Sequence, residues 1–448
     1  MNQKESIMKL EGKNLKIDFI KYILPSIAAQ WVFALYTMVD GIFVARGVSS
    51  TALTAVNISM PFTMGLFSIS ILFAVGTSTV IAILMGQGKV QQANQVFSQN
   101  IALLSILSVV ISVLVVVFLE PFALFLGATK TALPYVKEYI GTLAPMAFSF
   151  ILSYSFETLV KTDGYPRLAT IVVFIGALLN CVLDYLMVLI LKWGVFGAAL
   201  ATGISQMVVI LFYLKHFLGK KGTIRFVKFK WDLPLIWREI KNGTASGITE
   251  ISTGITIFLF NQMILRYLTE EDLVSYTIIS YVNSIITMSM AGIAQGVQPL
   301  ISYYHGQGKK ERCQKLFRYS LVAAFAFSII AGITCFFGAV PIVSLFITDK
   351  TSTLFISSVA VLRIFSISFL VVGYNVVIGG YFTAIEKALY STVISLSRGF
   401  VFIILSLFIL TWLFDGKGIW WAATLSEILC LLLSIGLTLY IGKMTKRC

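Results

Sequence analysis

The sequence predicts an all-α polytopic membrane protein of about twelve transmembrane helices, built as two similar six-helix halves. Of its 448 residues, 58% are hydrophobic and only 12% are charged, which is more apolar surface than a soluble domain can bury. Apolar stretches such as 102–119 and 168–191 are long enough to cross a hydrocarbon core of roughly 30 Å. Because the polar and apolar residues in them do not alternate, we expect a helical bundle and not a barrel.

Twelve apolar segments follow one another along the chain. They place the spans approximately at 17–45, 52–84, 96–119, 135–159, 168–190, 195–217, 243–267, 275–303, 317–347, 355–382, 389–413 and 419–441. An even number of crossings puts both termini on one side of the membrane.

The distribution of basic residues predicts which side that is. Lys and Arg concentrate in the terminal segments and in the loops after even-numbered spans, whereas the opposite loops hold only Arg46, Lys130, Lys137, Lys192, Arg266, Lys350 and Lys417. Cytoplasmic loops carry the excess of positive charge in membrane proteins. We therefore expect a multi-pass protein of the inner (plasma) membrane with both termini in the cytoplasm.

An internal repeat supports the division into halves. The segment Gly86-Gln87-Gly88-Lys89 recurs as Gly306-Gln307-Gly308-Lys309, at an offset of 220 residues that also pairs other positions. A duplicated unit with an even number of crossings keeps its orientation, so we expect a cavity between the two units. The predicted organisation is an N-terminal six-helix lobe at 1–218, a cytoplasmic basic linker at 219–242 and a C-terminal six-helix lobe at 243–448.

Several function classes are disfavoured. The two Gly-x-Gly-Lys loops lack the spacing of a nucleotide-binding loop, so an ion gradient of H⁺ or Na⁺ has to supply the energy for transport and no other cofactor is expected. The five cysteines are scattered, which argues against disulfides or a zinc site. The net charge of +14 fits contact with anionic lipids and not with nucleic acid. An enzyme would need a paired-aspartate motif or a His/Asp set, and we find neither.

Charged residues inside a bilayer are costly and therefore mark function. In the first half these residues are Asp40, Glu157 and Asp184, and Asn180 lies one helical turn before Asp184 on the same face. If the carboxylates share one pocket, they can bind and release protons, or hold Na⁺ with Asn180 and Thr202 as further ligands. The alternative is structural, with Asp40 ending the first span and Asp184 lying near the outer head groups.

The charges of the second half are more ambiguous. Arg398 and Glu427 can form a buried ion pair that fixes helix packing, or can take part in substrate binding or gating. Glu250 has no evident cationic partner and is a candidate substrate-facing carboxylate.

Four motifs together resemble the multidrug and toxic compound extrusion (MATE) family over essentially the full length. They are Met38-Val39-Asp40-Gly41-Ile42-Phe43-Val44, Asp163-Gly164-Tyr165-Pro166, Asn180-Cys181-Val182-Leu183-Asp184 and Ala294-Gln295-Gly296-Val297-Gln298-Pro299-Leu300. The resemblance implies two lobes around a V-shaped central cavity, with a cation-coupling pocket in the amino-terminal lobe.

The resemblance also implies roles for individual residues. Asp40, Asn180, Asp184 and Thr202 match the coupling pocket, whereas Glu157 stands where many members have asparagine. Glu250 resembles a residue of members with a carboxyl-lobe sodium site, but we find no acidic residue near Asn375 that would complete such a site. Gln295 of the fourth motif joins the substrate or gating candidates, which are Glu250, Gln295, Arg398 and Glu427. The amino-lobe site is preferred, with H⁺ ahead of Na⁺.

The leading hypothesis is therefore a monomeric drug/H⁺ or drug/Na⁺ antiporter for small cationic or amphipathic compounds. A flippase for a lipid-linked precursor, which the wider superfamily includes, is the alternative. Intramembrane acids outnumber bases, and this favours cationic cargo over a pyrophosphate.

Overall fold

The computed structural model describes residues 14–447 apart from 49, 220 and 415, and the side chains at 37, 38, 40–42, 44–47, 50–54 and 442–447 lie outside that description. Within the described part, every regular element is a helix. Eleven helices are long and apolar enough to cross a membrane, or up to twelve if a bent pair counts as one span. The fold class predicted from sequence is thus confirmed.

The described part of the first half of the chain contains ten helical elements. They are α2 (Leu15–Gly47), α3 (Ser50–Gly86), α4 (Val90–Val117), α5 (Leu119–Phe125), α6 (Leu133–Leu143), η1 (Ala144–Met146), α7 (Ala147–Thr162), α8 (Pro166–Asp184), η2 (Tyr185–Ile190) and α9 (Gly194–Leu218).

The second half contains a similar series. It comprises α10 (Leu233–Tyr267), α11 (Glu270–Gly306), α12 (Lys310–Phe337), α13 (Ala339–Ser344), α14 (Thr353–Ser366), α15 (Phe369–Ala384), α16 (Ala388–Leu396), η3 (Ser397–Val401), α17 (Phe402–Phe414) and α18 (Ile419–Arg447).

Breaks in regular α-helix occur within three of the spans. Pro145 lies in η1, a 3₁₀ turn between α6 and α7, where a proline cannot donate a helical hydrogen bond. The tenth span bends by 42° between α14 and α15. In the eleventh span η3 is a π turn between α16 and α17, a rare geometry that occurs frequently at functional sites.

The seventh span begins earlier than the sequence predicts. Helix α10 starts at Leu233, because Asp232 caps it by accepting a hydrogen bond from the backbone N–H of Leu235 and a proline occupies its first turn. The non-helical link therefore covers only 219–232, and the predicted boundary at 243 falls inside a helix. This link is fastened to the first lobe, since Asp163 accepts hydrogen bonds from the backbone N–H groups of Thr223 (2.8 Å) and Ile224 (3.0 Å).

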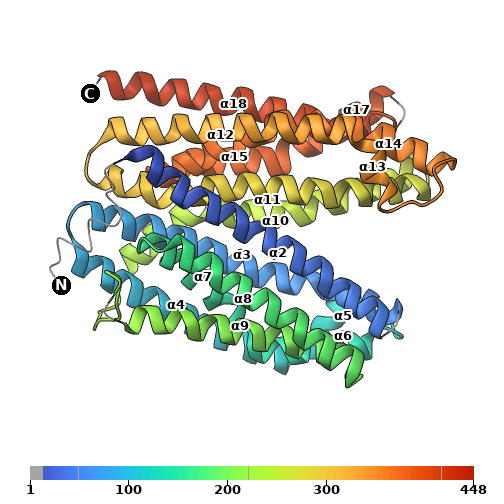
Figure 1. Cartoon of the computed structure of the whole chain (residues 1–448), viewed down its shortest axis with the longest axis horizontal. Coiled ribbons are helices and arrows are strands. Elements are labelled where there is room, and N and C mark those ends of the chain that lie inside the picture. The colour runs from blue at the N-terminus through green and yellow to red at the C-terminus, as the bar shows by residue number, and fades with distance from the viewer. Residues whose placement is uncertain (1–13, 49, 220, 415, 448) are drawn as a thin grey trace.

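The two lobes lie side by side and meet where α10 and α11 pack against α2 and α3 (Figure 1). Helix α10 packs along α3, and α11 packs along α2. The first contact is close because it uses glycines: a side-chain carbon at Gly76 would collide with the backbone of Glu239, and one at Gly243 would collide with the backbone of Leu72. Small residues of this kind let helix backbones approach each other in membranes.

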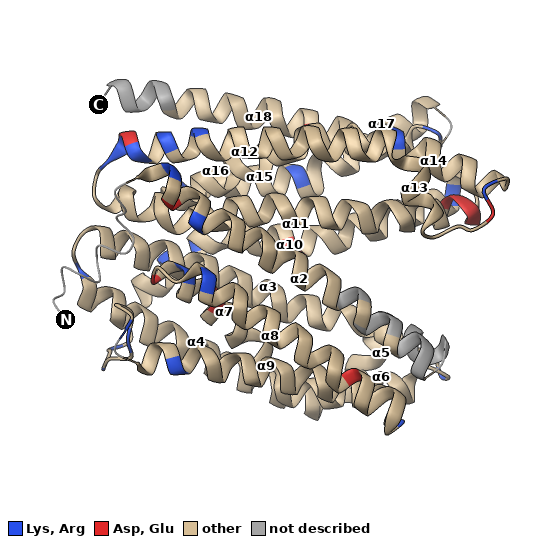
Figure 2. Ribbon diagram, in the orientation of Figure 1, with Lys and Arg blue, Asp and Glu red and all other residues tan. Residues whose placement is uncertain are grey.

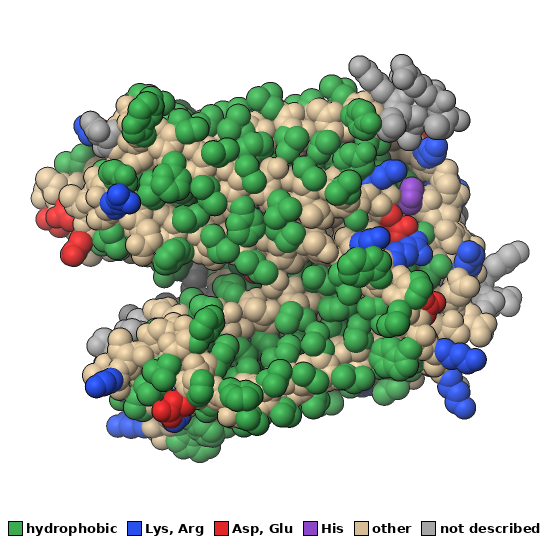
Figure 3. Space-filling view, turned by 180° about the vertical axis from the view of Figure 1, so that it is seen from behind, with side chains coloured by type: hydrophobic (Ala, Val, Ile, Leu, Met, Phe, Trp, Pro, Cys, Tyr) green, Lys and Arg blue, Asp and Glu red, His purple; other side chains and the backbone are tan. Residues whose placement is uncertain are grey.

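Charge and shape distinguish the two ends of the molecule. The start of α2 and the end of α18 lie at the same end, where many of the Lys and Arg residues gather (Figure 2). At the other end the lobes separate and leave a cleft between them (Figure 3). The architecture is thus a two-lobed V.

Candidate functional site

A cavity of about 300 Å³ lies between the lobes and is lined by both of them. Its wall mixes aromatic and aliphatic side chains with hydroxyl and amide groups, and four of its lining residues carry ionisable charges: Glu157, Glu250, Arg398 and Glu427. All four were singled out from the sequence. A largely apolar pocket with a few polar groups is typical of small-molecule sites.

Gln295 joins the two lobes across this cavity. Its side-chain oxygen on α11 accepts hydrogen bonds from the amide of Gln30 on α2 (3.0 Å) and from the hydroxyl of Tyr154 on α7 (3.2 Å). The sequence indicated Gln295 but missed Gln30 and Tyr154. Their polar groups inside long apolar spans were the available signal, but nothing local indicates that they face each other.

Glu157 lines the cavity and also a small pocket of about 50 Å³ inside the first lobe. Its Oε1 atom lies 2.6 Å from the Nζ atom of Lys161, one turn further along α7. Lys161 is only 4% exposed. The sequence placed this lysine in a cytoplasmic loop, whereas the structure places it in the helix, paired with Glu157.

The small pocket also reaches Asn180, another of the predicted coupling residues. Asn180 lines it and is buried, and its Nδ2 atom lies 3.4 Å from the hydroxyl oxygen of Thr202 on α9. Asp184 is fully buried at the last turn of α8. Asp40 belongs to α2, but its side chain lies outside the described residues. Asn180 and Thr202 are thus joined by a hydrogen bond, and Glu157 lines the same small pocket as Asn180.

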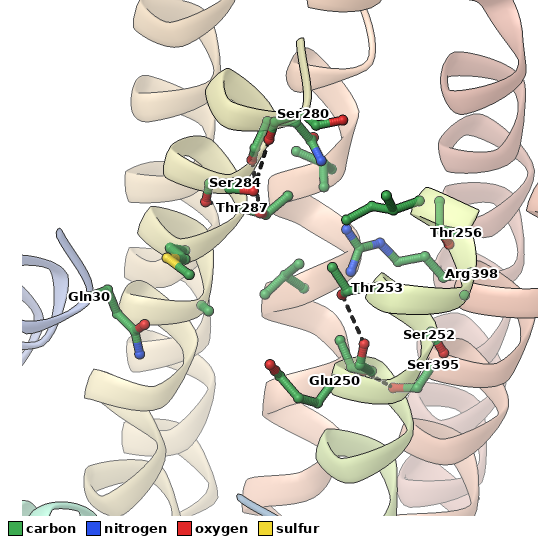
Figure 4. A pocket seen from close by; sticks show the side chains of 18 of the residues that line it. Gln30, Glu250, Ser252, Thr253, Thr256, Ser280, Ser284, Thr287, Ser395 and Arg398 are labelled. Atoms are coloured by element: carbon green, nitrogen blue, oxygen red, sulfur yellow. Dashed lines mark hydrogen bonds between the residues drawn. The ribbon is translucent and has the colours of Figure 1, made fainter. Parts of the chain in front are cut away.

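Glu250 occupies a different position, on the face of α10 that borders the large cavity. Among the described residues its carboxylate makes no ion pair and no hydrogen bond, while Thr249 and Ser395 beside it bond to each other (3.0 Å). Figure 4 shows Glu250 extending away from its helix toward the side of the cavity where Gln30 lies. An unpaired carboxylate in such a cavity is suited to binding a cation.

Arg398 and Glu427 form the ion pair that the sequence offered as one of two possibilities. The Nε atom of Arg398 lies 2.8 Å from Oε1 of Glu427. The other carboxylate oxygen of Glu427 accepts a hydrogen bond from Nδ2 of Asn375 (2.7 Å). The expectation that no acidic residue lies near Asn375 is thus wrong, because α18 brings Glu427 against α15 from far along the chain.

The arrangement of the His, Cys, Asp and Glu side chains bears on metal binding. Among the described residues no group of three or more His, Cys, Asp or Glu side chains is placed to hold a metal ion. Cys181, Cys313, Cys335 and Cys430, the cysteines of the described part of the chain, form no disulfide with one another. The polar groups of the first-lobe pocket are oxygen donors, the type that binds alkali cations or protons.

Both halves of the chain match a known protein family. Residues 25–186 and 246–409 each match the family model MatE. This chain belongs to the MatE family. The two matched segments fall in the two lobes, and members of this family are transporters and not enzymes.

Known MATE proteins resemble the chain over nearly its whole length. Multidrug export protein MepA of Staphylococcus haemolyticus is 25% identical over 434 residues, which are 96% of this chain and 95% of that protein. MepA of Staphylococcus saprophyticus is 24% identical over 430 residues, covering 96% and 94% of the two chains.

Two solved structures show the same fold. One is an outward-facing multidrug resistance MATE family transporter, with a TM-score of 0.93, 20% identity and 100% of both chains covered. The other is a transporter from Pyrococcus furiosus, described by the reverse polarity of its binding pocket, with a TM-score of 0.88, 21% identity and 97% and 98% of the chains covered.

Proposed function

We propose that this MATE protein is an ion-coupled antiporter that exports cationic or amphipathic drugs and toxic small molecules across the plasma membrane. Relatives that cover nearly the whole chain are multidrug export proteins, which supports the export of drugs. The monomer, with both termini in the cytoplasm, is the proposed working unit. The accumulation of Lys and Arg at one end supports this orientation (Figure 2).

The polarity of the cavity carries the proposal for a cationic substrate. Of the four ionisable lining residues, Glu157 is paired with Lys161, and Arg398 is paired with Glu427. This pairing leaves Glu250 as the one acidic lining residue without an ion-pair partner among the described residues. The cavity therefore has a net preference for positive charge, which disfavours the alternative of a lipid-linked pyrophosphate.

The coupling ion is proposed to bind in the first lobe, apart from the substrate. Asn180 and Thr202 present amide and hydroxyl oxygens there, and Asp184 is buried one turn from Asn180. Among the described groups, Oδ1 of Asn180 has no hydrogen-bond partner, so it is available as a ligand. With Asp40 on the adjacent α2, this set suits a proton first and a sodium ion second.

The test uses purified protein in reconstituted vesicles and a monovalent cationic dye. We expect an imposed H⁺ gradient to drive dye accumulation, and Glu250→Gln to raise KM by about tenfold through loss of one charge-assisted contact. Glu271→Gln, at an exposed position in the first turn of α11, is the matched control and should leave transport unchanged. Dye-induced proton release measured with and without Na⁺ distinguishes the coupling ions. Equal KM values for wild type and Glu250→Gln would contradict the substrate assignment.

A further inference from the structure

The guanidinium of Arg398 uses only part of its hydrogen-bonding capacity inside the protein. Its Nε atom donates to Glu427, but its two terminal nitrogens make no hydrogen bond to any described residue. The side chain lines the cavity and is 19% exposed. An arginine usually presents its donors as a planar fork that matches a carboxylate. Here the outer part of that fork is left for a ligand.

The side chain is also held firmly in place. Glu427 is fixed by Asn375, whose own side-chain oxygen accepts a hydrogen bond from the hydroxyl of Ser434 (3.2 Å). Arg398 itself sits on the π turn η3, which packs tightly on α10 because a side-chain carbon at Gly399 would collide with Ser252. The guanidinium is therefore oriented before any ligand arrives, and this lowers the entropic cost of binding.

Arg398 and Glu250 border the same cavity without neutralising each other. No ion pair joins these two residues. Glu250 lies on α10, whereas Arg398 lies on η3 and pairs with Glu427. In Figure 4 both side chains extend to the same side, with Thr253 between them. One wall of the cavity thus offers a site for positive charge next to a pair of donors for negative charge.

We propose that Arg398 is a specificity-determining residue of the cavity, which binds the anionic group of a substrate whose cationic group is bound by Glu250. This inference rests on the proposed function. Glu427 balances the charge of Arg398, so a simple cation in the cavity meets no net repulsion from this pair. A carboxylate on the substrate gains charge-assisted hydrogen bonds that a neutral ester cannot make as strongly.

A matched pair of dyes tests the proposal. Rhodamine B carries a cationic ring system and a carboxylate, whereas its ethyl ester carries only the cation. In reconstituted vesicles driven by an H⁺ gradient, the wild-type protein is expected to export both. Arg398→Gln should lower the ratio of kcat/KM for rhodamine B to kcat/KM for its ester by about tenfold. Arg363→Gln is the control, because Arg363 lies in the same lobe at an exposed position that does not line the cavity.

A second variant distinguishes the loss of a substrate contact from misfolding. In Arg398→Gln/Glu427→Gln a neutral amide pair replaces the ion pair, so no charge is left without its partner. The ratio of kcat/KM for rhodamine B to kcat/KM for the ester should fall in this variant by the same factor as in Arg398→Gln, whatever the absolute rates are. If this double variant keeps the wild-type ratio between the two dyes, or if the wild type exports only the ester, Arg398 has no role in binding substrate. If the wild type exports neither dye, the proposed function itself fails.

Discussion

The Nζ atom of Lys161 lies 2.6 Å from Oε1 of Glu157, and both side chains are largely buried in the first lobe. From the sequence, Glu157 belongs with Asp40 and Asp184 in a cluster of acids. The structure gives it a basic partner that shares its helix. Loss of the negative charge of Glu157 would leave the charge of Lys161 without its partner inside the bundle, so the two residues have to be considered as a unit.

Removing one member of this pair should destabilise the protein. We expect Glu157→Gln to lower the free energy of unfolding by about 3 kcal/mol, because Lys161 is left buried without its counter-charge. The double variant Glu157→Gln/Lys161→Gln should recover most of that loss. Thermal unfolding in detergent measures both. Glu120→Gln is the control, since its pair with Lys137 is exposed and worth at most about 1 kcal/mol.

The same residue bears on the number of protons moved in each cycle. We expect export of a monovalent cation to be electrogenic, and Glu157→Gln to make it less so. One-for-one exchange moves no net charge, so a potential contributes about 2.3 kcal/mol per 100 mV only if a second proton is carried. Vesicles with a fixed pH gradient, clamped at different potentials, provide the measurement. If the export rate and the final substrate gradient do not change with the membrane potential, a second coupling carboxylate is ruled out.

Coupling itself is expected to depend on the other two acids. Asp40→Asn or Asp184→Asn should abolish gradient-driven export, because neither amide can bind and release a proton. The variants should still insert and fold, which size-exclusion chromatography and surface expression would establish. Binding of the cationic dye to Glu250 should persist in both. Full drug resistance in cells that express either variant at normal levels would refute the coupling assignment.

The close contact between α3 and α10 predicts how the lobes respond to a larger side chain at their interface. In Gly243→Ala the new methyl group meets the backbone of Leu72, so the lobes have to move apart at a cost of about 1–3 kcal/mol. We expect this to expose a cysteine introduced at Thr77, which is fully buried in α3. Labelling by an impermeant thiol reagent, in a background without native cysteines, reports the opening. Gly254→Ala in the same helix has open space around it and should change nothing.

Orientation is tested by the same chemistry. Single cysteines at Lys310 and Lys220 should be labelled from the cytoplasm, and those at Lys130 and Lys350 from outside, as the distribution of basic loops predicts. Of these positions, Lys220 lies outside the described residues. Labelling of Lys310 and Lys130 from one side would show that the number of crossings between them is wrong.

Much of the site was accessible from the sequence because the membrane makes each polar residue conspicuous. Asn180 and Asp184 were placed on one face by their spacing alone, and the structure adds Thr202 as the hydrogen-bond partner of Asn180. Glu250 was recognised as an acid without a partner, and its position on the cavity wall is consistent with that. Helical periodicity suffices for such inferences, since they concern residues one turn apart.

The sequence by itself determined that this chain spans a membrane as two similar helical halves, and which charged groups lie inside, because hydropathy and the cost of burying charge are local properties. Only the tertiary structure decided which of these groups meet. Gln30 reaches Gln295 across 265 residues of sequence, and Glu427 reaches Asn375 across 52. Such pairings depend on how helices from distant parts of the chain cross, and the pattern within a single helix does not specify those crossings.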